Sequence, residues 1–537
     1  MPPAAPSPRT ITSSQLRLLA PVLILLAVVY AYSNACKGPF IFDDQLAIVT
    51  NPSIRTLWPI WTPMFPRGVV GTAGRPLVGL SFAVNYAIDG LNPRGYHAGN
   101  IAIHALAALV LWGVLRRTLQ QLAHPAAEVI ALAVTLIWAV HPLLTDTVTY
   151  VINRTEGLMA LFVLLTFYAF LRSLDSPHAR RWLAVSIVCN LLAVACKEVA
   201  AMAFPILLLF DWLIVSRSWK AIWQVRRWFY AGLLLGWILL PLLLATASAA
   251  VKTGGGGRLT SWQYLMMQSQ IILMYFRLAV WPRPLVICYV DWPVPSSLAD
   301  VLPQMLAVSA LVIATIILAI RRRPVAMLGL WIFLILAPSS SLLPLGSEPA
   351  AERRMYLPLI AIVLGVVLLL ERTIRRVPQR AAISLPLLAV AVLGLSQLTL
   401  YRNEDYATAL SMWAETVHQR PGNPRAQNYL AEALMEQGNY IGALECVDRA
   451  LAVAPNFGAA LNRRALILCS LGRLDEARAA FQRALLIDPA NPTSQAYYAW
   501  VLKQQGRPDQ ANAIWSELIR QHPNDQAIKE MVDQLRK

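Results

Sequence analysis

Charged residues are scarce in this chain of 537 residues, and acidic ones most of all. Only 14% of the residues are charged, with 29 Asp and Glu against 46 Lys and Arg, whereas 57% are hydrophobic. So little charge cannot give a soluble domain of this length a polar surface. The composition therefore excludes a soluble protein over most of the chain and predicts a multi-pass membrane protein.

Cysteine is also rare. The six cysteines, at positions 36, 189, 196, 288, 446 and 469, show no metal-ligand spacing. The sequence therefore predicts no cysteine-based metal site. Cys446 and Cys469 fit either a disulfide in an oxidising compartment or two unpaired buried thiols.

Apolar stretches of roughly 15 to 20 residues recur along the chain, long enough to cross a bilayer. No small-residue cleavage site follows the first one, so we interpret it as a retained span rather than a signal peptide. Eleven spans are predicted, at residues 16–32, 96–115, 126–140, 157–171, 182–196, 200–215, 228–246, 302–320, 325–343, 356–370 and 383–400. Residues 261–280 are apolar but interrupted by three glutamines and Arg277, and we expect them to lie along the outer face.

Basic residues beside the spans predict the orientation, because Lys and Arg stay on the cytoplasmic side. They fall in alternate connections, at Arg9/Arg17, Arg116/Arg117, Arg172/Arg180/Arg181, Arg217/Lys220/Arg226/Arg227, Arg321/Arg322/Arg323 and Arg372/Arg375/Arg376/Arg380. The amino terminus is therefore predicted inside, and connections 33–95, 141–156, 247–301 and 344–355 outside. The net charge of +17 mostly reflects these clusters facing anionic lipid, not nucleic-acid binding.

A repeat of 34 residues begins after the last span. Pro421, Pro455, Pro489 and Pro523 share this spacing, and one recurrent bulky position is filled by Trp413, Val447, Phe481 and Trp515. Small residues recur at 409, 443, 477 and 511, where paired helices would touch. This pattern is typical of a tetratricopeptide α-solenoid, which binds segments of other proteins. We expect an all-α protein with an integral membrane domain over residues 1–402 and about three full extracytoplasmic repeats over 403–537, the array reaching Asn524.

Ionisable residues gather in the predicted outer connections. Asp43 and Asp44 follow the first span almost directly, and adjacent carboxylates favour a raised pKa in one of them, which suits a general base. Two aspartates in a solvated loop are an equal alternative. His141, Asp146, Arg154 and Glu156 lie in the second connection, and Lys197 and Glu198 in a very short third one. Charges so close to spans usually line a cavity, although Lys197 and Glu198 could instead snorkel to the interface.

Arg353 and Arg354 lie at the predicted outer end of a span, where the distribution of positive charge disfavours them. Such a pair calls for an anionic partner. A lipid phosphate fits the planar fork of arginine, and pairing with Glu348 or Glu352 alone is the structural alternative.

The order of these motifs resembles the transmembrane and tetratricopeptide repeat family of protein O-mannosyltransferases and their bacterial relatives, which are multi-span C-type glycosyltransferases. The resemblance covers nearly the whole chain. The matching elements are Asp43-Asp44 with Asn51, Gly74-Arg75-Pro76-Leu77, residues 100–104, His141-Pro142 with Asp146 and Arg154, Lys197-Glu198, and Ala351-Glu352-Arg353 with Tyr356-Leu357-Pro358. Asp146 stands where the family usually has glutamate, and the repeats are fewer than in many members.

The resemblance implies a sugar donor linked through phosphate to a polyprenyl chain, and a hydroxyl acceptor on the outer face. It makes Asp43 or Asp44 the catalytic base and gives the donor phosphate to Arg353, Lys197 and Arg354. The other pocket candidates are Arg75, His141, Asp146, Arg154, Glu156, Glu198, Glu352 and Tyr356. Mannose comes from the resemblance alone.

One-base displacement at a sugar carbon predicts inversion of configuration. A divalent metal is disfavoured, because one acidic pair stands there with no histidine nearby in sequence. The repeats favour a protein Ser or Thr as acceptor, and the composition favours a bacterial inner membrane over the endoplasmic reticulum.

Two other functions fit parts of the pattern. A membrane-anchored scaffold would use the repeats to recruit periplasmic proteins without chemistry, and would scatter polar residues rather than cluster them at span ends. A transporter of lipid-linked sugars would need charged or broken positions within the spans. The spans contain few such positions, Asn190 being one of the exceptions. The sequence therefore favours an enzyme at the membrane surface.

Overall fold

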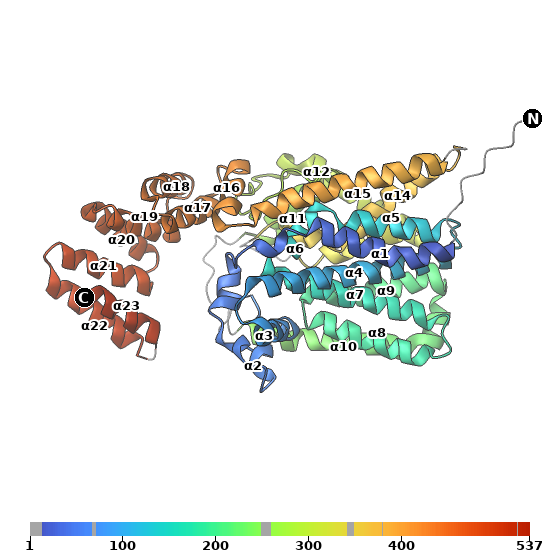
Figure 1. The fold of residues 1–537 in the computed structure, drawn as a ribbon, viewed down its shortest axis with the longest axis horizontal. Helices are drawn as coiled ribbons and strands as arrows, with labels where there is room; N and C mark the ends of the chain where they lie inside the picture. Colours follow the sequence, from blue (N-terminus) through green and yellow to red (C-terminus); the bar gives the residue numbers. More distant parts are fainter. Residues whose placement is uncertain (1–12, 67–70, 249–258, 341–347, 378–379, 524) are drawn as a thin grey trace, which may run out of the picture. The chain divides into compact units, whose positions relative to one another are not determined.

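The computed structural model describes residues 13–66, 71–248, 259–340, 348–377, 380–523 and 525–537. The described part is helical and contains no strand, as expected (Figure 1). Arg9, the last residues of the predicted span 325–343, Pro344 and Asn524 lie outside the described residues. The α-helices are α1 (Ser13–Ala31), α2 (Trp61–Met64), α3 (Pro76–Asp89), α4 (Pro93–Gln121), α5 (Ala127–Ala139), α6 (Thr145–Val148), α7 (Arg154–Ser173), α8 (Ala179–Val194), α9 (Ala203–Phe210), α10 (Trp219–Ser248), α11 (Ser261–Val280), α12 (Leu302–Ile320), α13 (Ala326–Leu336), α14 (Pro358–Ile374), α15 (Arg380–Asp405), α16 (Ala409–Gln419), α17 (Pro424–Glu436), α18 (Tyr440–Val453), α19 (Gly458–Ser470), α20 (Leu474–Ile487), α21 (Pro492–Gln504), α22 (Pro508–Gln521) and α23 (Gln526–Arg536).

The chain divides into two compact units. One contains Met1–Ile287 and Trp292–Thr408, and the other contains Cys288–Asp291 and Ala409–Lys537. The division falls a few residues beyond the expected position 402, because α15 continues as one helix to Asp405. Within the second unit, Arg420 Nε donates to Asp291 Oδ1 at 2.7 Å, which fastens the short segment to the first repeat helices.

The first unit is a bundle of apolar helices. Helices α4, α7, α8 and α10 run alongside one another, and α5 packs on α1, α4 and α14 (Figure 1). Each of the eleven predicted spans is helical over most of its described residues. Seven helical stretches there are long and apolar enough to cross a membrane, or eight if α5 and the bent segment Pro142–Val148 form one span. Helices α8, α13 and α14 are shorter, so the count of eleven stays a prediction.

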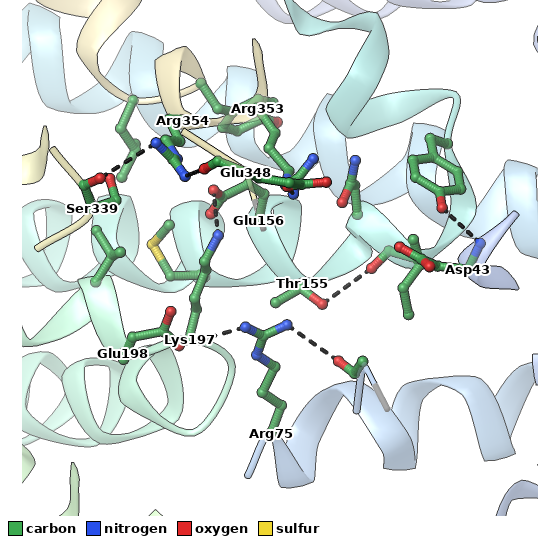
Figure 2. Close-up of a pocket in the computed structure, with 18 of the residues that line it drawn as sticks. Asp43, Arg75, Thr155, Glu156, Lys197, Glu198, Ser339, Glu348, Arg353 and Arg354 are labelled. Carbon is green, nitrogen blue, oxygen red and sulfur yellow. Dashed lines mark hydrogen bonds and ion pairs between the residues drawn. The ribbon is translucent and has the colours of Figure 1, made fainter. Parts of the chain in front are cut away.

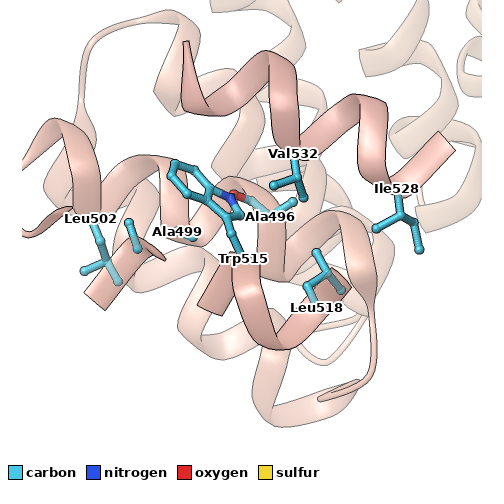
Figure 3. Packing of buried hydrophobic residues seen from close by; sticks show 8 residues of the cluster. Ala496, Ala499, Leu502, Trp515, Leu518, Ile528 and Val532 are labelled. Carbon is cyan, nitrogen blue, oxygen red and sulfur yellow. The ribbon is translucent and has the colours of Figure 1, made fainter. Parts of the chain in front are cut away.

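The second unit confirms the tetratricopeptide pattern. Helices pair in sequence as α17 with α18, α19 with α20 and α21 with α22, giving three full repeats. The four residues at the recurrent bulky position are all buried. Trp515 also donates from its indole nitrogen to Ala496 O at 3.0 Å, and Ile528 and Val532 of α23 join the same cluster (Figure 3). The final helix therefore closes the apolar core of the last repeat.

Glycine marks the turn inside each repeat. Gly438, Gly472 and Gly506 have φ angles of 74°, 74° and 76°. A Cβ at these positions would meet no atom within 4 Å, so backbone conformation rather than space explains the glycine. Cys446 and Cys469 are unpaired, which decides between the two alternatives for these thiols.

Candidate active site

One end of the first unit contains a cavity of about 260 Å³ (Figure 2). Its wall combines helix ends and connections far apart in sequence, all of them predicted to share the outer face. The described lining residues are Phe42, Asp43, Gly71, Arg75, Tyr150, Ile152, Asn153, Thr155, Glu156, Met159, Lys197, Glu198, Val199, Ile287, Ile335, Ser339, Glu348, Arg353, Arg354, Tyr356 and Leu357. An acidic residue from near the start of the chain thus shares a cavity with cations from its middle and later parts.

Three of the four cations at this cavity have a carboxylate partner. Lys197 Nζ lies 2.7 Å from Glu156 Oε1, and Arg75 Nη2 lies 3.6 Å from Glu198 Oε2. Arg353 pairs with Glu348 and also lies 3.7 Å from Asp146 Oδ2. These pairs fix the side chains and leave little net charge at three points of the wall.

Arg354 differs from the other three cations. Its guanidinium donates to backbone carbonyls, at 2.7 Å to Pro349 O, 2.6 Å to Glu348 O and 3.3 Å to Ser339 O. Carbonyl oxygens orient a guanidinium without neutralising it. Within the described residues no carboxylate forms an ion pair with Arg354, so this side chain brings an uncompensated positive charge to the cavity wall.

The two adjacent aspartates face different surroundings. Asp43 lines the cavity, and its backbone N–H donates to the Tyr150 hydroxyl at 2.9 Å. Asp44 is fully buried outside the lining, where Oδ2 accepts from Ile41 N at 3.1 Å and Oδ1 accepts from Ile152 N at 2.8 Å. Phe42, just before the pair, has a φ of 48°. This left-handed residue belongs to the tight turn from which the two side chains diverge.

Burial dominates the protonation of this region. It raises the pKa of Asp44 to about 8, against the two backbone amides that favour its ionised form. It also raises the pKa of Tyr150, and the charges of Asp43 and Asp44 add to that shift. For Arg353, burial lowers the pKa, but Glu348, Asp146 and Glu156 outweigh it and raise the pKa above its usual value. Arg353 therefore stays charged.

Four predicted pocket residues and Asp44 lie outside the cavity lining. His141 is buried, accepting from Leu143 N and contacting Ala279 O at 3.1 Å. Arg154 is enclosed by oxygens of α3 and α4, including Asn100 Oδ1 at 2.7 Å. Glu352 accepts from Val286 N at 2.6 Å, and Asp146 accepts from the backbone of Arg353 at 3.0 Å. A buried polar or charged group needs hydrogen-bond partners wherever it lies. These four residues find theirs within the protein, and the contacts hold neighbouring segments together.

Sequence reasoning missed Tyr150 as a cavity residue. Its hydroxyl accepts from the backbone of Asp43 and is one of the contacts that join the first connection to the second. The available signal was a tyrosine between Asp146 and Glu156 in a connection already suspected of function. As for metals, no group of three or more His, Cys, Asp or Glu side chains in the described part of the chain is arranged to hold an ion.

Comparison with known proteins agrees with this architecture. Residues 76–244 match the family described as dolichyl-phosphate-mannose-protein mannosyltransferase, and residues 398–445, 433–493 and 468–535 match tetratricopeptide repeat families. The first match covers α3 to most of α10 and includes the cavity residues Glu156, Lys197 and Glu198.

The matches to two curated relatives extend over most of this chain. Protein O-mannosyl-transferase Tmtc3 of Drosophila melanogaster is 25% identical over 91% of this chain and 61% of its own length. Human protein O-mannosyl-transferase TMTC1 is 25% identical over 82% of this chain and 56% of its own length. Human TMTC3 is 33% identical over 33% of this chain and 20% of its own length. The chain thus joins a mannosyltransferase-type membrane domain to tetratricopeptide repeats and is homologous to these proteins, while spanning about 60% of the length of the first two.

Proposed function

We propose that this protein is a membrane glycosyltransferase. It transfers a hexose, mannose by analogy with its relatives, from a polyprenyl-phosphate-linked donor to a hydroxyl of a protein Ser or Thr. The reaction takes place on the extracytoplasmic face of a bacterial inner membrane, and the tetratricopeptide repeats hold the acceptor protein. The supporting comparison is the mannosyltransferase match over residues 76–244.

The observation that carries the proposal is the composition of the cavity wall. Asp43 shares a cavity of about 260 Å³ with Arg354, a cation held by carbonyls and without an ion pair among the described residues. Transfer from a phospholipid needs a base for the acceptor hydroxyl and a cation for the leaving phosphate. The cavity supplies both in a setting partly screened from water, which favours transfer over hydrolysis.

The chemical step is a single displacement. The acceptor oxygen attacks the anomeric carbon through an oxocarbenium-like transition state while Asp43 takes its proton. The bond from that carbon to the phosphate oxygen breaks, and the oxygen leaves with the electron pair. Arg354 and Arg353 stabilise the negative charge that develops on the phosphate. Because no carboxylate attacks the anomeric carbon, this single displacement inverts the configuration there. No metal is assigned to the step, and transfer is expected to persist in a chelator.

The test uses the full-length protein in lipid vesicles with polyprenyl-phosphate mannose and a Ser- and Thr-containing acceptor peptide. Asp43→Asn should lower the rate of transfer by at least roughly 100-fold. The variant should still bind donor, because only the base is removed. Arg354→Gln should raise the KM for donor by roughly tenfold or more. Binding of donor is measured separately by its quenching of protein tryptophan fluorescence.

The comparison variant is Arg116→Gln, at a basic connection remote from the cavity lining. It should transfer the sugar as the wild type does. Wild-type turnover by Asp43→Asn would remove the base assignment. A wild-type protein that transfers no sugar but retains peptide on its repeats would favour a scaffold instead.

A further inference from the structure

Glu156 has one satisfied and one unsatisfied carboxylate oxygen. It lies in the first turn of α7, lines the cavity and is 4% exposed. Oε1 receives a hydrogen bond from Lys197 Nζ at 2.7 Å. Oε2 is buried and has no hydrogen-bond partner within the described part of the chain. Buried polar atoms are nearly always bonded, so an orphaned acceptor in a cavity wall calls for a donor from outside the protein.

The chemistry of the missing partner follows from the charges around Glu156. The carboxylate is already balanced by Lys197, so a second cation is not required. An ionised phosphate has no proton to donate and would be repelled by the carboxylate. A neutral hydroxyl donates one proton and suits an oxygen that can only accept. The orphaned oxygen therefore fits a polyhydroxylated ligand rather than the phosphate itself.

The position of Glu156 selects the hydroxyl. Figure 2 shows its carboxylate beside Lys197 and toward Glu348 and Arg353, with Thr155 between this group and Asp43. In the proposed reaction, which this inference presupposes, the phosphate lies near the guanidinium groups and the acceptor near Asp43. The group joined directly to the phosphate is the sugar. We infer that Glu156 Oε2 accepts a hydrogen bond from a hydroxyl of the donor sugar and that Lys197 donates to a neighbouring sugar oxygen.

Lys197 then binds an oxygen of the donor sugar, whereas its positive charge alone would indicate the donor phosphate. Paired with Glu156 at 2.7 Å, the ammonium has its charge offset but keeps two further N–H donors. A donor and an acceptor side by side match two adjacent hydroxyls of a ring. The pair would then determine which sugar is accepted, whereas Arg354 would recognise the phosphate of any polyprenyl donor.

The test compares polyprenyl-phosphate mannose with analogues that each lack one hydroxyl, using the full-length protein in vesicles. For the wild type, removing the hydroxyl bound by Glu156 should lower kcat/KM by roughly 10- to 100-fold. In Glu156→Gln this loss should shrink, and in the double variant Glu156→Leu with Lys197→Met it should vanish. The double variant removes both charges together, so that no unpaired charge is left buried.

Glu198→Gln is the matched control, because it also neutralises a cavity carboxylate beside a cation. Its discrimination between the analogues should equal that of the wild type. Binding of polyprenyl phosphate without sugar, retained by every variant, shows that the cavity is intact. Equal losses in wild type and Glu156 variants, as expected if a water occupies the site, would overturn the inference alone. No transfer of the complete sugar by the wild type would overturn the proposed function as well.

Discussion

Asp44 joins two connections through a carboxyl group that is fully buried. Burial raises its pKa to about 8, whereas an aspartate in the unfolded chain titrates near 4. Between these values the folded protein binds more protons than the unfolded chain, so this group contributes stability at low pH that is lost as the pH rises toward 8. In Asp44→Asn that contribution is absent at every pH.

The difference in melting temperature between wild type and Asp44→Asn should therefore narrow as the pH rises from about 5 to about 8. Thermal unfolding of the detergent-solubilised proteins, followed by intrinsic fluorescence, measures it. The variant should be less stable overall, because an amide cannot accept from both Ile41 N and Ile152 N. A difference that stays constant over this pH range would mean that Asp44 is already ionised in the folded protein.

Tyr150 holds the backbone of Asp43 at the cavity. Tyr150→Phe removes the acceptor of the Asp43 N–H, so the carboxylate loses part of its fixed position. We expect turnover to fall by roughly tenfold with little change in the KM for donor. Tyr230→Phe is the matched control, since its hydroxyl also bonds a buried partner, Asp211, but lies outside the cavity lining. Equal effects of the two changes on turnover would show that Tyr150 acts only through stability.

The residues that share the cavity could be predicted only in part. Alternation of basic connections predicted which segments share one face, and those segments bring Asp43, Lys197, Arg353 and Arg354 together. The sequence could not separate Asp43 from Asp44, because the choice depends on the irregular backbone around Phe42. Nor could the sequence show that Arg154 bonds other parts of the protein instead of lining the cavity. A buried structural arginine and a ligand-binding arginine both appear as an ionisable residue beside an apolar run.

Helix α11 illustrates the same limit at the scale of elements. Hydrophobic length predicts a helix at Ser261–Val280, but not whether it crosses the membrane. In the structure the Tyr264 hydroxyl donates to Ser339 O, near the start of the helix, and Ala279 O contacts His141 near its end. Ser339 lines the cavity, and His141 begins the connection that carries Tyr150. Both ends of α11 thus contact segments from the cavity end of the bundle.

A helix with both ends at one face does not cross, so the two ends should be accessible from the same side. We would introduce Trp262→Cys and Val280→Cys, at exposed positions, into a variant without the six native cysteines. A membrane-impermeant thiol reagent should label both from the side that carries the repeats. Labelling of the two positions from opposite sides would show that α11 is a twelfth span.

At the scale of the molecule, the basic connections lie together at the other end of the bundle. Arg117 pairs with Asp175 at 2.7 Å, Arg17 pairs with Glu128 at 2.7 Å, and Arg322 donates to Arg217 O at 3.0 Å. These contacts link five connections or termini that the charge pattern assigned to one face. The cavity connections hold the opposite helix ends, and Asn403 in the last turn of α15 bonds Thr149 and Asn34 there. The last helix of the first unit therefore ends at the cavity side of the bundle.

Because Lys and Arg remain on the cytoplasmic side, the cavity and the repeats are expected outside. A protease added to intact spheroplasts of a producing bacterium should remove the repeat region and leave the basic connections uncut. In inverted membrane vesicles the pattern should reverse, with cleavage near Arg321–Arg323 and protected repeats. Protected repeats in spheroplasts would place the cavity in the cytoplasm, where a donor and acceptor presented outside could not reach Asp43, and the proposed reaction would have to be abandoned.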